Sequence, residues 1–254
     1  MTVLLSPRLA WIHDAIPQGW GMADIGTDHA YIPVSLVRQG AVPMAVAGDI
    51  HSGPLATARQ HVALYGVADR VHVREGNGLE VIAPGEVQTI VIAGMGGGTI
   101  RHILDEGMAQ GKLAGVECLI LQPLEGATGL RTWLADHGWF FNQEDLIAEG
   151  PRIYEVMQMH RGNGQAQLQH PDWPAYVQSL SAELGPLLLE RRHPLLVTLI
   201  ERLLERDRRA LAGMGRSKQP DTAAIGHKAE RIKNLEMVKE WLLLAHKSSN
   251  GSNS

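Results

Sequence analysis

The chain has 254 residues, of which 44% are hydrophobic and 20% charged, and its formal net charge is −4 at pH 7. This is enough apolar material for one large or two modest domains, which excludes wholesale disorder. The single cysteine, Cys118, excludes a disulfide framework and a cysteine-based zinc site and indicates a reducing, cytoplasmic compartment. No apolar run approaches the roughly 18 residues of a membrane-spanning helix, so we expect no membrane partner.

Short apolar runs alternate with helical patterns up to about residue 160. Residues 1–17 predict an amphipathic helix rather than a signal peptide, because they lack a basic leading segment. Five strand-like runs follow in chain order, at 21–26, 44–50, 70–76, 88–94 and 116–123. Helical patterns follow four of these runs, at 30–39, 54–65, 99–108 and 127–137. Strands that alternate with helices predict an α/β fold with a parallel sheet and right-handed crossovers.

The end of this half breaks the alternation. Residues 139–148 and 152–160 are both strand-like, and only a turn with Gly150 and Pro151 separates them. No helix fits between them, so they must form an antiparallel hairpin. A parallel sheet that closes in such a hairpin is typical of the Rossmann-like class I methyltransferase fold and is unusual for dehydrogenases.

A polar, glycine-containing segment at 161–170 leads into a helical second half. One helix running to about Gly213 carries leucines on one face, and a second carries apolar residues at nearly heptad spacing. These residues are Leu196, Leu199, Leu203 and Leu211 in the first helix, and Ile225, Ile232, Leu235, Val238 and Leu242 in the second. Their short connection predicts an antiparallel, coiled-coil-like hairpin of helices. We therefore expect an α/β domain at 1–162, a helical domain at 163–247 and a tail at 248–254 that is too polar to fold.

The charge is divided unevenly between the two halves. Residues 1–189 carry a net charge of −9, and residues 190–240 carry a net charge of +4. A basic helical end beside an acidic body indicates an anionic partner for the second half. The alternative is a solvated helix face of mixed charge, which composition does not distinguish.

Candidate ligand-binding residues end the first two strands. Ligands of an open parallel sheet bind at the carboxyl ends of its strands, where Asp24, Gly26 and Asp49 are expected. An acid at the end of the second strand can accept hydrogen bonds from both ribose hydroxyls of an adenosyl ligand. Dehydrogenases and methyltransferases both use an acid at this position, so it does not distinguish them. The alternative for Asp49 is the N-cap of the next helix.

Two glycine-rich loops follow the third and fourth strands. Asn77, between two glycines, suits the edge of a purine, although a plain turn is the alternative. The run at 93–99 fails the dinucleotide fingerprint, because Thr99 stands where the last glycine belongs. We interpret residues 94–98 as a wall of bare backbone where a methyl donor and a flat substrate meet, and the alternative is a helix entry loop.

Asp28 and His29 stand where a nucleotide-binding loop would prefer small residues. A carboxylate at this place points toward the occupant of the crevice, and the alternative is an Asx turn or N-cap for the helix that begins near Ala30. The twelve histidines show no metal-binding spacing, so we expect no metal. The chain has no G-x-S-x-G elbow, which argues against hydrolase chemistry.

The chain resembles the bacterial tRNA (adenine-22-N1)-methyltransferase family in six segments, taken in order. They are residues 22–33, 48–58, 76–82, 90–100, 119–123 and 149–157. The resemblance implies a class I methyltransferase that uses S-adenosyl-L-methionine, takes tRNA as its substrate and forms N1-methyladenosine. Two positions depart from the family's pattern: Leu124 follows Gln122 and Pro123 where the family commonly has Asn, and Asn77 replaces an Asp.

The resemblance also implies roles for individual residues. Asp28 would act on the developing cationic adenine, with Tyr31 as a stacking or positioning neighbour. The cofactor-binding candidates are Asp24, Gly26, His29, Asp49, Ile50, Gly76, Asn77, Gly78, Ala93, Gly94, Met95 and Gly96. The basic charge of the second half, rather than a family motif, indicates the tRNA-binding candidates, which are Arg191, Arg192, Arg202, Arg206, Arg208, Arg209, Arg216 and Lys218.

A function of a different class also fits the sequence. The chain could be a non-catalytic adaptor that binds a nucleotide and docks a protein through its helical hairpin. The loss of a polar residue at Leu124 favours this alternative slightly. Of the possible oligomeric states, we expect a monomer.

Overall fold

The computed structural model describes residues 5–215 and 221–250. The chain forms two compact units, Met1–Gln165 and Ala166–Ser254. The polar segment expected at 161–170 contains this division.

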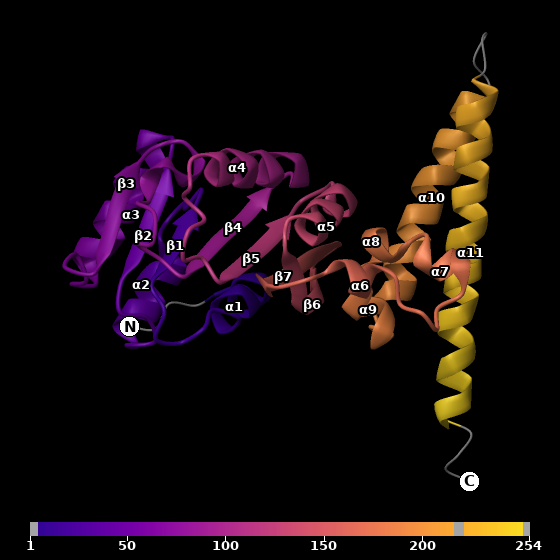
Figure 1. The fold of residues 1–254 in the computed structure, drawn as a ribbon, viewed down its shortest axis with the longest axis horizontal. Coiled ribbons are helices and arrows are strands. Elements are labelled where there is room, and N and C mark those ends of the chain that lie inside the picture. The colour runs from indigo at the N-terminus through magenta and orange to yellow at the C-terminus, as the bar shows by residue number, and fades with distance from the viewer. Residues whose placement is uncertain (1–4, 216–220, 251–254) are drawn as a thin grey trace. The chain divides into compact units, whose positions relative to one another are not determined.

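The first unit is built on a seven-stranded sheet with the order β3-β2-β1-β4-β5-β7-β6 (Figure 1). Its strands are β1 (Met22–Ile25), β2 (Ala45–Asp49), β3 (Val71–Glu75), β4 (Thr89–Met95), β5 (Cys118–Pro123), β6 (Trp139–Glu149) and β7 (Arg152–Arg161). The first five strands pair in parallel, whereas β7 is antiparallel to both β5 and β6. The predicted parallel sheet and its terminal hairpin are therefore confirmed.

Helices cover both faces of this sheet. The first unit contains α1 (Pro7–Asp14), α2 (Tyr31–Arg38), α3 (Ser52–Leu64), the 3-10 helix η1 (Gly78–Val81), α4 (Gly97–Ala109) and α5 (Ala127–Asp136). Buried residues from each of α1, α2 and α3 contribute to one cluster on one face of the sheet, and α4 packs beside α5 on the other (Figure 1). The four predicted helices that follow strands are found within a few residues of their expected bounds, and the helix expected within residues 1–17 spans Pro7–Asp14. The short helix η1 was not predicted.

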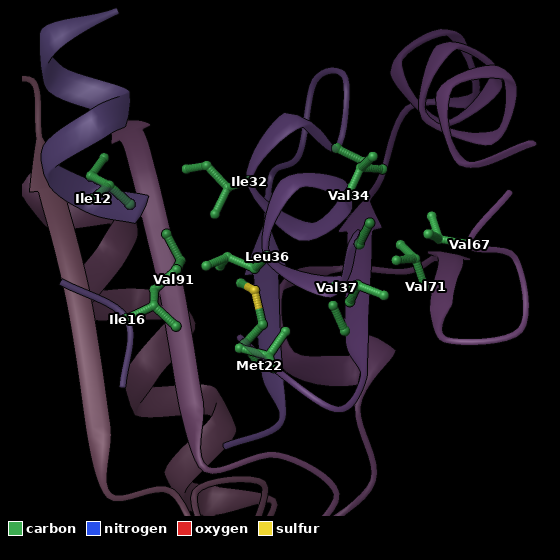
Figure 2. Packing of buried hydrophobic residues seen from close by; sticks show 14 of the residues in the cluster. Ile12, Ile16, Met22, Ile32, Val34, Leu36, Val37, Val67, Val71 and Val91 are labelled. Atoms are coloured by element: carbon green, nitrogen blue, oxygen red, sulfur yellow. The ribbon is translucent and has the colours of Figure 1, made fainter. Parts of the chain in front are cut away.

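One hydrophobic cluster joins the N-terminal helices to the sheet (Figure 2). Ile12 and Ile16 lie at α1 and its end, next to Val91 of β4, and Leu36 of α2 lies near Met22 of β1. All of these side chains are buried. Strands that are covered on both faces need apolar side chains at successive positions, which is why the whole of β5 is buried.

Glycines shape the end of β4. The pairing with β5 shifts register between Ala93 and Met95, and Gly94 between them has φ +77°. A residue with a Cβ is strained in that conformation, so glycine is the natural choice at this irregularity. Gly97 is required for a different reason, because a Cβ there would lie 2.4 Å from the carbonyl oxygen of Gly126.

The second unit is helical. Its helices are α6 (Gln165–Leu168, which begins at the last residue of the first unit), α7 (Ala175–Gln178), α8 (Ser181–Leu184), α9 (Pro186–Glu190), α10 (Leu196–Met214) and α11 (Thr222–Asn250). The two long helices pack against each other, as predicted. The predicted apolar face of α11 is buried at Ile232, Leu235, Val238 and Leu242.

The buried face of α10 differs from the predicted one. It consists of Leu196, Ile200, Leu204 and Asp207, while Leu199, Leu203 and Leu211 are only half-buried. The observed positions are spaced by four, four and three residues, which keeps them on one side of a helix. The predicted leucines share only Leu196 with this face, since they omit the apolar Ile200 and Leu204 as well as the buried acid Asp207.

The prediction that the chain stops folding at residue 248 is wrong for residues 248–250. The helix α11 continues to Asn250, because each residue added to an existing helix gains a backbone hydrogen bond without a new nucleation cost. Residues 251–254 lie outside the described ranges. No helix within those ranges is both long and apolar enough to cross a membrane.

Candidate active site

The strand order reverses between β1 and β4, and their carboxyl ends open onto two adjoining cavities. Such a reversal is where ligands bind in open α/β sheets. The first, called here the β2 cavity, has a volume of about 250 Å³. It is lined by Ile25, Gly26, Gly48, Asp49, Ile50, His51, Gly76, Asn77, Gly78, Ala93, Gly94, Met95, Thr99, His102 and Ile103.

Asp49 lies at the end of β2 with a largely buried side chain. Its Oδ1 accepts a hydrogen bond from the backbone N–H of His51 at 2.7 Å and lies 3.0 Å from the Nδ1 atom of that residue. The N-cap of α3 is His51, so the structure does not use Asp49 as the cap. In the described part of the chain Oδ2 has no partner, which leaves it available to a ligand.

Glycine residues without side chains form much of the wall of the β2 cavity. A Cβ at Gly48 would lie 2.7 Å from Cγ2 of Val81, and one at Gly26 would lie 2.1 Å from Cε of Met95. Asn77 is the N-cap residue of η1, and its backbone N–H donates to Oε2 of Glu80 at 3.1 Å. This cradle of glycines, with one carboxylate and one amide, fits the ribose and base of an adenosine.

The second cavity, called here the α2 cavity, has a volume of about 390 Å³. It shares Gly26, Ala93 and Gly94 with the β2 cavity. Its other lining residues are Arg8, Leu9, Asp24, Thr27, Asp28, His29, Ala30, Tyr31 and Ile32. Two ligands seated in the two cavities would therefore meet across the same short stretch of backbone.

The side chains of Asp28 and His29 lie within hydrogen-bonding distance of each other at the α2 cavity. Oδ2 of Asp28 lies 3.0 Å from Nε2 of His29, and the Asp28 side chain is 76% exposed. The backbone N–H of Ala30 donates to Oγ1 of Thr27 at 3.1 Å. Thr27, rather than Asp28, thus closes the turn before α2, and the capping alternative for Asp28 is not what the structure contains.

Aromatic rings gather beside this pair. The ring of Tyr31 lies 5.1 Å from that of His29 and 4.9 Å from that of His61. Nδ1 of His61 lies 2.9 Å from the backbone oxygen of His29, which ties α3 to the loop before α2. The partly exposed Tyr31 is thus placed where a flat ring entering the α2 cavity can contact it.

Comparisons with known proteins agree with this geometry. A family model described as a methyltransferase domain matches residues 5–157. The tRNA (adenine(22)-N(1))-methyltransferase of Bacillus subtilis (strain 168) is 43% identical over 162 residues, which are 64% of this chain and 67% of that protein. The crystal structure of the B. subtilis tRNA methyltransferase TrmK has a TM-score of 0.84 at 33% identity and covers 93% of this chain and 99% of its own.

The chain belongs to the tRNA (adenine(22)-N(1))-methyltransferase family. A Streptococcus pneumoniae relative in complex with S-adenosyl-L-methionine has a TM-score of 0.79 at 32% identity, and the match covers 93% of this chain and all of that one. The resemblance to this family inferred from the sequence is confirmed. The adaptor alternative is not favoured, because these relatives are named as methyltransferases.

The predicted cofactor-binding residues of this methyltransferase all line one of the two cavities, with one exception. Gly96 lines neither cavity and serves as the N-cap residue of α4. The structure adds residues that the sequence did not suggest: Arg8, Leu9, Ile25, Thr27, Ala30, Ile32, Gly48, His51, Thr99, His102 and Ile103. Arg8 stands far from the glycine-rich loops in the sequence, and no local pattern connects it with them.

The surroundings of Asp24 shift the pKa of its carboxyl group. Burial raises its pKa from 3.8 to about 6; a hydrogen bond from Thr27 opposes the rise and the charge of Asp49 adds to it. An ionised Asp24 is therefore costly in the ligand-free protein. A cationic group placed beside it would remove that cost.

The candidate tRNA-binding arginines of the second unit are partly engaged with acids. Arg208 pairs with Glu236 at 2.6 Å, Arg209 pairs with Glu205, and Nε of Arg206 lies 3.7 Å from the buried Asp207. Arg192 lies over the ring of Trp241, while Arg191 and Arg202 are in the same unit and Arg216 and Lys218 lie outside the described residues. At Arg208 and Arg209 the geometry agrees with a solvated face of mixed charge.

Proposed function

We propose that this methyltransferase transfers a methyl group from S-adenosyl-L-methionine to N1 of adenine 22 in tRNA. The observation that carries the proposal is the pair of adjoining cavities. One offers Asp49 and glycine backbone, and the other offers Asp28, His29 and Tyr31. The names of the B. subtilis relatives supply the substrate, and the S. pneumoniae complex supplies the methyl donor.

The reaction asks for little covalent work from the protein. The donor, when bound, supplies an electrophilic methyl group on a sulfonium, and adenine N1 carries an in-plane lone pair that can attack it. The residues of the two cavities need to align the two partners and exclude water. Gly26, Ala93 and Gly94 border both cavities, so we assign the meeting point of methyl group and base to this stretch.

We assign the following roles to the residues. Asp49 accepts hydrogen bonds from the ribose hydroxyls, and Asn77 contacts the purine edge of the donor. The product ring is cationic, and Asp28 stabilises this charge as it develops near the exocyclic nitrogen. Tyr31 stacks on or positions the target base.

The target adenine belongs to a folded RNA, so it has to leave its stack to enter the α2 cavity. Contacts to phosphates supply affinity and orientation rather than base reading. Residues 1–189 carry a net charge of −9, which suits the cationic donor better than it suits RNA. We therefore assign the grip on tRNA to the arginines of the second unit.

Incubation with isotopically labelled S-adenosyl-L-methionine and unmodified tRNA, followed by nucleoside analysis, tests the proposal. We expect labelled N1-methyladenosine, and no label in a transcript that carries guanine in place of adenine 22. Label in another nucleoside, or label that survives the guanine replacement, would contradict the proposal.

We also propose that the protein acts in the cytoplasm and as a monomer. A buried, free Cys118 and a tRNA substrate support the location. Light scattering during gel filtration tests the oligomeric state, and a mass near twice 27.7 kDa would contradict it.

A further inference from the structure

A series of aromatic rings continues from the α2 cavity over α2 and α3. The ring of Tyr31, which lines the cavity, lies 4.9 Å from that of His61, and the His61 ring lies 6.4 Å from that of Tyr65. Arg38 is the last residue of α2, and its guanidinium carbon lies 4.8 Å from the centre of the Tyr65 ring. His61, Tyr65 and Arg38, called here the ring surface, are thus continuous with the cavity that we assign to the target base.

The ring surface is accessible, and its rings are held in place before any ligand arrives. His61 and Tyr65 are half-buried, and Arg38 is exposed. Nδ1 of His61 lies 2.9 Å from the backbone oxygen of His29, which fixes the orientation of the imidazole. Side chains that are already ordered lose little conformational entropy when a ligand contacts them.

The charge of these two helices differs from that of the chain around them. Residues 1–189 carry a net charge of −9, yet neither α2 nor α3 contains an Asp or a Glu. The acid of the preceding loop, Asp28, lies beside His29 at the cavity. Proteins bind unstacked nucleotides with this combination of groups, because a base can stack on an aromatic ring or on a guanidinium plane and a cation attracts the phosphate.

We propose that the ring surface binds the nucleotide next to the target adenine, with its base against the rings and its phosphate at Arg38. The inference rests on the proposed function, because it presumes that the adenine occupies the α2 cavity. An adenine that leaves its stack deprives the adjoining base of a stacking partner, and an aromatic side chain can replace that partner. An exposed arginine on two helices without acids favours a nucleotide over an apolar segment of a protein.

The test combines variants of the full chain with altered transcripts of unmodified tRNA. Tyr65→Leu removes a ring and should weaken tRNA binding in the presence of S-adenosylhomocysteine by about fivefold or more, the lower end of the range for a base on an aromatic ring. Tyr65→Phe keeps the ring and should bind tRNA as the parent does. Arg38→Gln should weaken binding and make it less dependent on salt, because a phosphate contact is lost.

Arg59→Gln is the matched control for Arg38→Gln. Arg59 is an exposed arginine of α3 that lines a separate cavity with residues of β3, so its loss should leave the dissociation constant for tRNA at the parent value. All four variants should bind S-adenosylhomocysteine with the parent's affinity, because the ring surface lies outside the β2 cavity.

Two further transcripts identify the base, one with an abasic residue at position 21 and one with an abasic residue at position 23. If one of these bases lies on the Tyr65 ring, its removal should weaken binding to the parent and cause no further loss in Tyr65→Leu. An equal effect of Tyr65→Leu on all three transcripts would mean that the ring only holds α3 beside α2, and would overturn the inference. Unchanged tRNA binding in both Tyr65→Leu and Arg38→Gln would also overturn it and would leave the surface to a protein partner. The proposed function fails separately, if the parent forms no N1-methyladenosine in the unaltered transcript.

Discussion

At the scale of single residues, we assign the carboxylates near the strand ends to two roles, donor binding for Asp49 and Asp24 and stabilisation of the reacting adenine for Asp28. Asp49 and Asp24 end neighbouring strands, and Asp28 follows in the loop before α2. Sequence reasoning could place all three near one another, because the carboxyl ends of parallel strands converge on one edge of the sheet. It could not find Arg8, whose place depends on how α1 packs against the sheet through Ile12 and Ile16.

The first prediction concerns Asp49. Its Oδ2 is left without a partner while Oδ1 is held by His51, so a ribose should gain a charge-assisted hydrogen bond there. Asp49→Ala should weaken donor binding by about 1.5–3 kcal/mol, the scale of a hydrogen bond to a charged group. Calorimetry with S-adenosylhomocysteine measures this, with the exposed Asp69→Ala as the control. Unchanged affinity would remove Asp49 from the site.

The second prediction concerns Asp28. Its contribution should appear as charge develops on the adenine, so Asp28→Asn should lower kcat far more than it lowers donor affinity. The side chain is 76% exposed, and water screens it. We therefore expect a loss of about tenfold, below the roughly 10²–10³ of a desolvated oxyanion-hole donor. Single-turnover kinetics beside donor titration separates the two effects. Equal losses in both would make Asp28 a donor ligand instead.

The third prediction concerns the pH dependence of Asp24. Its pKa is raised from 3.8 to about 6 in the folded protein, so ionisation works against folding. The stability associated with the protonated form is fully present below pH 3.8 and is lost as pH rises through 6. Asp24→Asn removes this loss, and should stabilise the ligand-free protein by about 2–3 kcal/mol at pH 8.

Urea unfolding of the parent and Asp24→Asn between about pH 4 and pH 8 measures this difference. The gap should shrink toward zero as the pH falls from about 6 to about 4, while the same substitution weakens donor binding at every pH above about 6. A gap that stays constant across the series would show that ionisation of Asp24 is not its cause.

At the scale of elements, the hydrophobic pattern was sufficient to predict the type and order of the helices and strands. It was not sufficient to predict which face of every helix is buried. The buried strands and the hairpin of β6 and β7 follow from continuous apolar runs and from a separation too short for a helix. The predicted face of α10 omitted the buried Ile200 and Leu204, and it also omitted Asp207, which is 1% exposed. An acid in a helix is ordinarily assigned to the solvent side, and only tertiary contacts reveal that its counter-ions come from α11.

The fourth prediction tests that ionic contact. Asp207 pairs with Arg231 and, at 3.2 Å, with Lys228, and Arg231 also pairs with Glu183 of α8. Asp207→Ala should destabilise the helical unit by about 2–3 kcal/mol, somewhat less than the roughly 3–5 kcal/mol for a fully buried pair, because both cations keep some exposure. Thermal unfolding measures it, with the exposed Glu205→Ala as the control. Equal stability of the two variants would make the Asp207 cluster dispensable.

At the scale of the whole molecule, two compact units carry charges of opposite sign. Sequence reasoning could find this division, because charge and hydrophobic pattern both change beyond the segment 161–170. It could not tell which arginines are available, since the pairs of Arg208 with Glu236 and of Arg209 with Glu205 depend on the packing and spacing of the helices. The net charge of the second half therefore overstates what a phosphate backbone would meet.

The fifth prediction asks whether the exposed arginines along α10, including the paired Arg209, bind tRNA. Arg202, Arg206 and Arg209 are spaced four and three residues apart, which sets them along one exposed face of α10. Replacing Arg202 and Arg209 by Gln leaves Arg206 beside Asp207 and should not disturb the buried face of the helix. Binding to phosphates releases counter-ions, so the slope of log affinity against log salt should become shallower by roughly one for each phosphate that the variant no longer neutralises. Donor affinity should be unchanged, because the donor site belongs to the first unit.

The control removes two exposed arginines of that unit, Arg59 and Arg152, and changes the net charge equally. If both double variants bind tRNA with the parent's salt slope, the basic face of α10 is only solvated surface; if both lose affinity alike, net charge rather than this face attracts the RNA.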